Sequence, residues 1–209
     1  MATYKLDIAF TNDQLESLYQ TNSSVIIAKP SEGQSTPNVA WQSFKALPAN
    51  TLTWQEEYGI YVSNTEMVHG AQLDQLSSTE IGAIMDQLYT MEPSGVITGP
   101  ESFDAPNSFA LLNEYKNQSY MTVGLFQDAN VNGTDIIGNA TSAAPVLLAS
   151  TAVMTPYTTV YVWIQSQVVS NTVCTLVTSP MTELKFGGGV NDISVAYNSE
   201  SGKFYTPQS

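Results

Sequence analysis

The longest uncharged stretch of the chain limits its fold more than any other feature. Residues 136–182 include no Asp, Glu, Lys, Arg or His, and their apolar runs are interrupted by Thr, Ser, Asn, Gln and Pro. A membrane-spanning helix needs about 20 nearly continuous apolar residues, so the stretch does not predict one. Its centre, residues 158–178, is rich in β-branched and aromatic residues, which predicts two strands that meet at Ser170 and Asn171 as a hairpin. We expect this stretch to form the interior of a β-sheet protein.

The rest of the chain also predicts strands. Apolar side chains alternate in residues 4–10, which places Tyr4, Leu6, Ile8 and Phe10 on one face of a strand. Further short strands, separated by Gly, Pro and Asn, are predicted at residues 25–29, 39–45, 51–63, 108–115, 120–126, 144–150, 182–186 and 192–197. Short strands at this close spacing are typical of a β-sandwich or a β-barrel, and we expect a β-sandwich.

Two segments predict helical structure. Residues 11–19 begin with the polar cap residue Thr11 and carry Leu15, Leu18 and Tyr19 at helical spacing. Residues 77–88 fit either a short capped helix or an irregular crossover, because Gly82 would weaken a helix. The predicted fold class is therefore all-β with one or two short helices.

The domain organisation has two interpretations. Residues 91–107 contain three Pro and two Gly, the composition of a linker, and the segment before Trp54 resembles the segment before Trp163. These features favour two related sandwich-like halves, an acidic N-terminal half at 1–100 and a low-charge C-terminal half at 107–209. The other interpretation is one elaborated β domain that spans residues 1–209.

The charge composition excludes several partners. The chain has six Lys, no Arg and 19 acids, which gives a net charge of −13. Arg supplies the bidentate contacts to phosphate and guanine, and a negative field repels polyanions. We therefore expect neither nucleic acid nor an anionic membrane as a partner. The low charge of the second half favours contacts between copies of the chain, so we expect a homo-oligomer.

The N-terminal residues indicate where the chain is made. Residues 1–8 have neither the basic segment nor the apolar segment of a secretory signal, so we expect synthesis in the cytoplasm. A secreted mature form from which a leader has been removed is the other interpretation. Cys174 is the only cysteine, so it forms no internal disulfide, and its apolar surroundings predict a buried thiol.

The sequence predicts no catalytic machinery. His69 is the only histidine, Cys174 lies in an apolar strand, and there is neither a Gly-x-Ser-x-Gly elbow nor a phosphate-binding glycine loop. A glycoside hydrolase that uses two carboxylates is the remaining enzymatic hypothesis, with Glu56, Glu57 and Glu66 close to several aromatic residues. Adjacent strand residues point to opposite faces, however, so Glu56 and Glu57 should not converge. We expect a protein that is not an enzyme.

Calcium is the one ion for which the sequence offers a candidate site. Asp128, Asn130 and Asn132 place oxygen ligands at positions 1, 3 and 5 of a loop that has Gly at position 6, as in an EF-hand, and Asp135 follows. Position 12 holds Asn139 in place of the bidentate Glu. Asn132 and Gly133 also form the strongest short hairpin-turn signal in the chain. The segment is therefore either a plain turn or an ion site, and no other cofactor is expected.

Five aromatic residues are the candidate ligand-binding residues. They are Trp41, Trp54, Tyr58, Tyr61 and Trp163. Aromatic side chains dominate β-sheet interiors, so each of them has an interpretation as a core residue. On a rim beside Asn and Asp, their flat rings would instead stack on the apolar faces of a sugar.

Three functional hypotheses follow. The first is a non-catalytic, lectin-like protein that binds a neutral glycan, or a similar polar ligand on a membrane surface, through loop aromatics with Asn and Asp. The second is a β-pore-forming toxin that acts on neutral membranes through the uncharged hairpin at residues 158–178, although a hairpin buried on both faces fits that sequence equally well. The third is a self-assembling structural or storage protein.

Overall fold

The protein is almost entirely β-sheet. The computed structural model describes residues 2–31 and 36–207, and this part of the chain contains 19 strands and one helix. Several sheets pack together, which confirms the predicted all-β class and is consistent with a sandwich. The strands are β1 (Thr3–Ala9), β2 (Ser23–Ala28), β3 (Val39–Ala40), β4 (Gln42–Phe44), β5 (Ala49–Gln55), β6 (Gly59–Ser63), β7 (Gln75–Ser78), β8 (Gln87–Met91), β9 (Ile97–Ser102), β10 (Phe109–Asn113), β11 (Tyr120–Val131), β12 (Thr134–Ala140), β13 (Ala144–Leu147), β14 (Thr151–Met154), β15 (Thr159–Ser166), β16 (Thr172–Val173), β17 (Thr182–Lys185), β18 (Asp192–Asn198) and β19 (Lys203–Tyr205).

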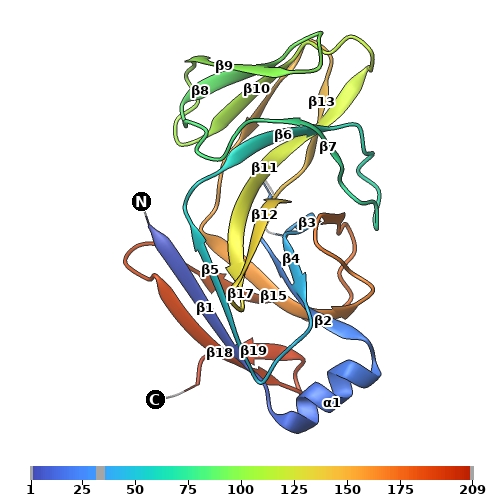
Figure 1. Ribbon diagram of the computed structural model, residues 1–209, viewed down its shortest axis with the longest axis vertical. Helices are drawn as coiled ribbons and strands as arrows, with labels where there is room; N and C mark the ends of the chain where they lie inside the picture. The colour runs from blue at the N-terminus through green and yellow to red at the C-terminus, as the bar shows by residue number, and fades with distance from the viewer. Residues whose placement is uncertain (1, 32–35, 208–209) are drawn as a thin grey trace.

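The molecule is elongated and has two lobes that share the long strand β11 (Figure 1). The largest sheet has the order β19-β18-β1-β5-β11-β6-β7, and β12 and β13 also pair with β11. The first half of β11 pairs with β6 and β13 in the upper lobe of Figure 1, and its second half pairs with β5 and β12 in the lower lobe. A four-stranded sheet, β14-β10-β8-β9, completes the upper lobe, and another, β17-β15-β2-β4, completes the lower lobe.

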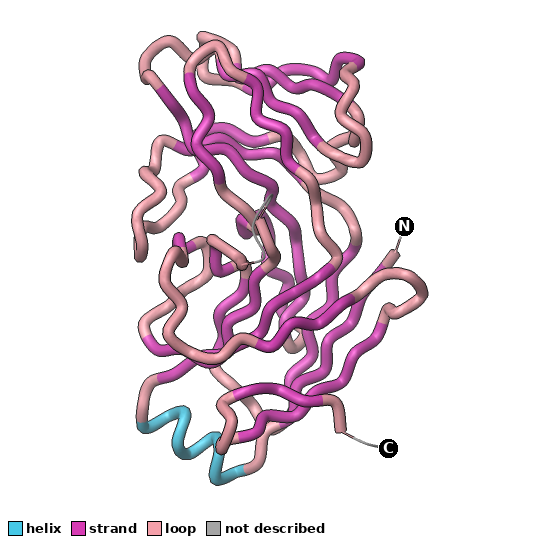
Figure 2. Tube along the Cα trace, turned by 180° about the vertical axis from the view of Figure 1, so that it is seen from behind, coloured by secondary structure: helices cyan, strands magenta, loops and turns pink. Residues whose placement is uncertain are grey.

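Each lobe has its own apolar core. The upper core packs β6, β8, β10 and the first half of β11 around Tyr89, Phe109 and Met121. In the lower core, the sheet of β2 and β15 lies against β1, β5 and β18. The buried face of β1 consists of Tyr4, Leu6 and Ile8, with Phe10 directly after it, as the alternation in the sequence predicts. The tube in Figure 2 shows the same two lobes from behind, with the helix at the far end of the lower one.

The single helix, α1 (Asn12–Gln20), closes the bottom of the lower lobe. Thr11 caps the helix. Its hydroxyl accepts a hydrogen bond from the backbone amide of Gln14, and the side-chain oxygen of Gln14 accepts one from the backbone amide of Thr11. This reciprocal capping box satisfies two amides that the first turn would otherwise leave unpaired. Leu15 and Leu18 are buried, so the helix predicted at residues 11–19 is confirmed.

The predicted hairpin at residues 158–178 is wrong, although both of its strands exist. β15 pairs with β2 and β17, whereas β16 pairs with β3, so the two strands do not bond to each other. Val160 and Val162 face the lower core, and Trp163 is buried in a separate cluster on the other face of β15. In β15 the uncharged sequence therefore reflects burial on both faces, as in the interior strands of a sheet covered on both sides. Elsewhere in residues 136–182 the expected interior position is wrong, because Ile137, Leu147 and Val169 are exposed.

Two other segments differ from the sequence-based predictions. The proposed linker at residues 91–107 contains β9, an edge strand that forms a hairpin with β8. Residues 79–86 form an irregular crossover between β7 and β8, so the helical interpretation of residues 77–88 is wrong. Gly82 has a φ of +93° and Asp86 a φ of +59°, and both values are incompatible with a right-handed helix.

The two lobes do not correspond to the two halves of the sequence. Each of the four sheets combines strands from residues 1–102 with strands from residues 109–205. β1 pairs with β18, β2 with β15 and β8 with β10, all across the predicted linker. The chain thus passes between the lobes repeatedly, and both parts of the sequence contribute to both cores.

Two glycines permit close packing where β6 pairs with β11. A Cβ atom on Gly124 would overlap the carbonyl oxygen of Ser142 and the ring of Tyr61, and a Cβ atom on Gly59 would overlap the ring of Phe126. Gly124 lies opposite Tyr61 and Phe126 opposite Gly59 in the ladder. The backbone oxygen of Ser142 cannot rotate away as a side chain could, so the packing at Gly124 is the less tolerant of the two.

We predict that Gly124→Ala lowers the free energy of unfolding by about 2 kcal/mol or more, because it forces a methyl group against backbone in a close-packed site. Urea denaturation measures the change. Ser78→Ala on the exposed strand β7 is the control and should change stability by less than about 0.5 kcal/mol. Equal stability of the two variants would contradict the prediction.

Candidate functional site

A groove lies beside the hairpin formed by β11 and β12 in the lower lobe. It has a volume of about 410 Å³ and combines carboxylate, amide and hydroxyl side chains with three isoleucines and one tryptophan. Its lining residues are Thr3, Thr53, Trp54, Gln55, Glu57, Ile81, Asp128, Ala129, Asn130, Asp135, Ile136 and Ile137. They come from β1, β5, the bend after β5, the crossover before β8, β11 and β12. The groove thus gathers residues that are more than 100 positions apart in the chain.

The hairpin turn that borders the groove is the one predicted from Asn132 and Gly133. Both residues have positive φ, 52° and 84°, and Val131 pairs with Thr134, so the loop has two residues. The side-chain oxygen of Asn132 accepts a hydrogen bond from the backbone amide of Thr51 at 2.8 Å. The side-chain nitrogen of Asn132 donates to the side-chain oxygen of Asn50 at 3.3 Å. These contacts attach the tip of the hairpin to the start of β5.

Polar contacts within the hairpin orient the acidic side chains. The Asn130 amide donates to Asp135 Oδ1 at 2.7 Å, and Asn130 Oδ1 accepts the backbone amide of Gly133 at 2.9 Å. Asp128 lies at a bulge in the pairing of β11 with β12, and its Oδ1 accepts the amide of Gly138 at 2.7 Å. One oxygen of each carboxylate is therefore held by the hairpin, and no hydrogen bond within the described residues occupies the other.

The structure brings together three of the four predicted calcium ligands. Asp128, Asn130 and Asp135 line the groove, whereas Asn132 contacts β5 and does not. In the part of the chain that the structure describes, no three His, Cys, Asp or Glu side chains lie close enough together to hold a metal ion. Calcium binding by Asp128, Asn130, Asn132 and Asp135 stays a prediction.

The five candidate aromatic residues are buried instead of forming a surface. Trp41, Tyr61 and Trp163 have 0% of their surface exposed, Tyr58 has 2% and Trp54 has 3%. Each ring lies on an inward-facing position of a strand or beside one, where its large apolar area is removed from water. Trp54 is the one member of the set that also borders the groove. The five aromatic side chains therefore form part of the protein interior and do not form the expected binding surface.

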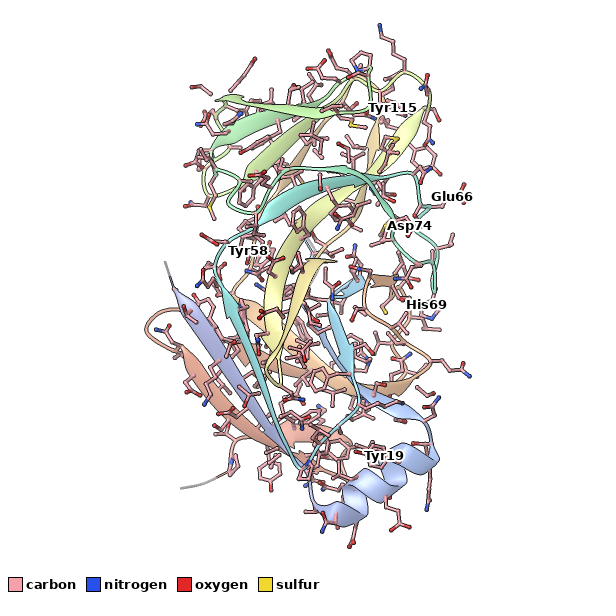
Figure 3. All side chains as sticks on the ribbon, viewed as in Figure 1. Tyr19, Tyr58, Glu66, His69, Asp74 and Tyr115 are labelled. Atoms are coloured by element: carbon pink, nitrogen blue, oxygen red, sulfur yellow. The ribbon has the colours of Figure 1, made fainter. Side chains whose placement is uncertain are left out.

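A lysine that sequence analysis did not single out lies among these rings. Lys29 follows β2 and is only 2% exposed. Its Nζ atom lies 5.3 Å, 5.7 Å and 4.9 Å from the ring centroids of Trp41, Trp54 and Tyr58, distances at which a cation is attracted to an aromatic face. Nζ also donates to the Tyr58 hydroxyl at 2.9 Å, and that hydroxyl donates to Glu56 Oε1 at 2.7 Å. Figure 3 shows Tyr58 at the junction between the lobes.

Burial changes the protonation of this cluster. It lowers the pKa of Lys29 to about 8, although the negative charge of Glu56 opposes the shift. Burial also raises the pKa of Tyr58 well above 10, and Glu56 adds to that shift. The local signal in the sequence was a single Lys at the end of an apolar strand and before Pro30, in a chain with only six lysines. An internal lysine of this kind is rare, because an ammonium loses its hydration on burial.

Glu56 and Glu57 do not converge, as predicted, although both lie in the bend between β5 and β6 and not in a strand. Glu56 turns inward to Tyr58, and Glu57 lines the groove. Glu66 lies on an exposed loop with Asp74 and His69, across the molecule from Tyr58 in Figure 3. The structure therefore does not bring the three glutamates together.

His69 and Cys174 belong to neighbouring segments despite their separation in sequence. The amide of Gly70 donates to the carbonyl of Val173 at 2.8 Å, and the amide of Leu176 donates to His69 Nδ1 at 3.3 Å. Cys174 is 2% exposed, and burial raises the pKa of its thiol. The prediction of a buried cysteine is confirmed, and its protonated thiol is a poor nucleophile.

Comparison of the chain with protein-family models, with curated proteins and with solved structures gave no match. Within the described residues, no helix has both the length and the apolar character needed to cross a membrane.

We predict that the stability of the protein rises between about pH 8 and pH 10 because of Lys29. In this range the unfolded chain, with a lysine pKa near 10.5, binds a proton that the folded chain, with a pKa of about 8, does not bind. The free energy of unfolding therefore increases as the pH rises, by up to about 3 kcal/mol in total for a pKa shift of this size. The measurement is urea denaturation of the wild type and Lys29→Met across the range.

The difference in unfolding free energy, wild type minus Lys29→Met, should become more positive as the pH rises. Titrating groups that do not interact with Lys29 are present in both proteins, so their effects cancel. Lys185→Met, at a lysine whose side chain is 74% exposed, is the matched control and should give a flat difference. A flat difference for Lys29→Met as well would show that the buried ammonium does not have the lowered pKa.

Proposed function

We propose that this protein is a non-catalytic, lectin-like binding protein that holds a neutral saccharide in the groove beside the β11–β12 hairpin. The observation that supports this most directly is the composition of the groove. The exposed Ile137 and the partly buried Ile136 lie in the same groove as Glu57, Asn130 and Asp135, and the buried Trp54 borders it. A sugar has apolar C–H faces and a ring of hydroxyl groups, and a site for it needs both kinds of side chain in one place.

The hydrogen-bonding capacity of the groove suits hydroxyl donors. Glu57 makes no hydrogen bond with the described residues, and one oxygen of Asp128 and one of Asp135 are similarly without a protein donor. Charged acceptors form stronger hydrogen bonds than neutral ones. A polyol that donates several hydroxyl groups would satisfy them.

The charge of the groove favours a neutral ligand over an anionic one. Glu57, Asp128 and Asp135 line it, and none of its lining residues is Lys, Arg or His. Together with the net charge of −13, this arrangement repels sialic acids, uronic acids and sulfated sugars. The position of β15 between β2 and β17, within the lower lobe, supports a binding protein over the alternative of a pore-forming toxin.

A saccharide panel tests the proposal. We expect neutral oligosaccharides to bind, in isothermal calorimetry or saturation-transfer NMR, and sialylated or uronic-acid oligosaccharides to bind at least tenfold more weakly. Glu57→Ala should weaken neutral binding by about tenfold, the loss expected when one charged hydrogen bond is removed. Ile137→Ser should also weaken binding, because it removes the most exposed apolar contact.

Matched substitutions outside the groove serve as controls. Glu101→Ala removes an exposed acid from β9, and Val96→Ser removes a side chain that is 56% exposed in the upper lobe. Both should leave binding unchanged. The proposal fails if no neutral saccharide binds, or if binding is equally strong in the groove variants and the controls.

A further inference from the structure

Three residues in or beside the Lys29 cluster each have a buried polar atom with no hydrogen-bond partner among the described residues. These atoms are the indole nitrogen of Trp54, Oε2 of Glu56 and Oε1 of Gln127. Buried polar atoms in folded proteins are nearly always paired with protein or with ordered water. Their concentration in one part of the interior therefore needs an explanation. The one other such atom, Nε2 of Gln42, belongs to a side chain whose oxygen accepts from Asn139.

Other contacts hold these three side chains around the lysine. Gln127 is fixed at both ends, because its side-chain amide donates to the carbonyl of Gln55 at 2.6 Å and its backbone carbonyl accepts the Trp41 indole at 3.0 Å. The other oxygen of Glu56 accepts from Tyr58, which in turn accepts from Lys29. The unpartnered atoms are thus positioned by the fold and are not free to turn toward solvent.

The chemistry of these atoms identifies what can lie between them. The Trp54 indole is a donor, Glu56 Oε2 and Gln127 Oε1 are acceptors, and the Lys29 ammonium has more N–H groups than its one bond to Tyr58 uses. A metal ion needs a shell of acceptors and an anion needs a shell of donors. Water both donates and accepts and is small enough to be enclosed, so it suits a mixed shell, and buried waters typically make about three hydrogen bonds.

We propose that the junction between the lobes contains an enclosed hydration site, in which ordered water bridges Lys29 to Glu56, Gln127 and Trp54. The site is separate from the saccharide groove, although Trp54 borders both. It explains how the fold holds an ammonium group away from bulk solvent, since water supplies the hydrogen bonds that Tyr58 alone cannot.

Water cross-relaxation NMR on the ¹⁵N-labelled protein tests the proposal with its own internal controls. All three tryptophans are buried, but the indoles of Trp41 and Trp163 donate to Gln127 and Gln165, whereas the Trp54 indole is unpartnered. We expect a rotating-frame cross-peak between water and the Trp54 indole proton at least threefold stronger than those of the other two. No cross-peak at Trp54, or equal cross-peaks at all three indoles, would overturn the proposal.

A crystal structure that resolves ordered water is the second measurement, because a hydroxyl proton of Tyr58 that exchanges with solvent could imitate bound water in the NMR experiment. We expect a density peak within hydrogen-bonding distance of Lys29 Nζ and of at least one of the three unpartnered atoms. Direct pairing of those atoms with one another or with Lys29, without such a peak, would overturn the proposal.

Discussion

The pairing of β11 with strands of both lobes is the constraint on which the rest of the structure depends. β11 bonds to β6 and β13 with its first half and to β5 and β12 with its second, so it belongs to both lobes at once. A strand of 12 residues is long enough to pass from one core to the other without a break. The bend between β5 and β6 crosses beside it, and the cluster around Lys29 lies there. The groove forms where the far end of β11 turns back into β12.

Local sequence patterns predicted most of the strands but not their partners. Alternation in β1, the Thr11 cap of α1 and the Asn132-Gly133 turn are encoded within a few residues, and each appears in the structure as predicted. The pairing of β15 with β2 depends on contacts more than 130 residues apart in the chain, which no local pattern specifies. For the same reason, the sequence analysis predicted a hairpin at residues 158–178 that does not form. It also missed the pairing of strands before residue 91 with strands after residue 107.

The candidate site was predicted in part for the same physical reason. Asp128, Asn130 and Asp135 could be grouped from the sequence because a short hairpin holds them together. Their proximity to Trp54 and Glu57 comes from the pairing of β5 with β11, which only the fold reveals. Lys29 was missed because charge in a sequence is normally read as exposure. Its burial follows from the three rings and the glutamate that other segments place around it.

Trp54 connects the groove with the Lys29 cluster at the junction between the lobes. It borders the groove, and its ring lies 5.7 Å from the ammonium of Lys29 and packs against Trp41, Tyr4 and Phe186. Contacts on several sides hold the ring in one orientation, so the wall that it gives the groove is rigid before any ligand arrives. Rigid walls lose little conformational entropy on binding. If the groove binds a saccharide as proposed, the buried cation and its aromatic neighbours would assist binding indirectly, by fixing the position of Trp54 and with it the shape of the groove.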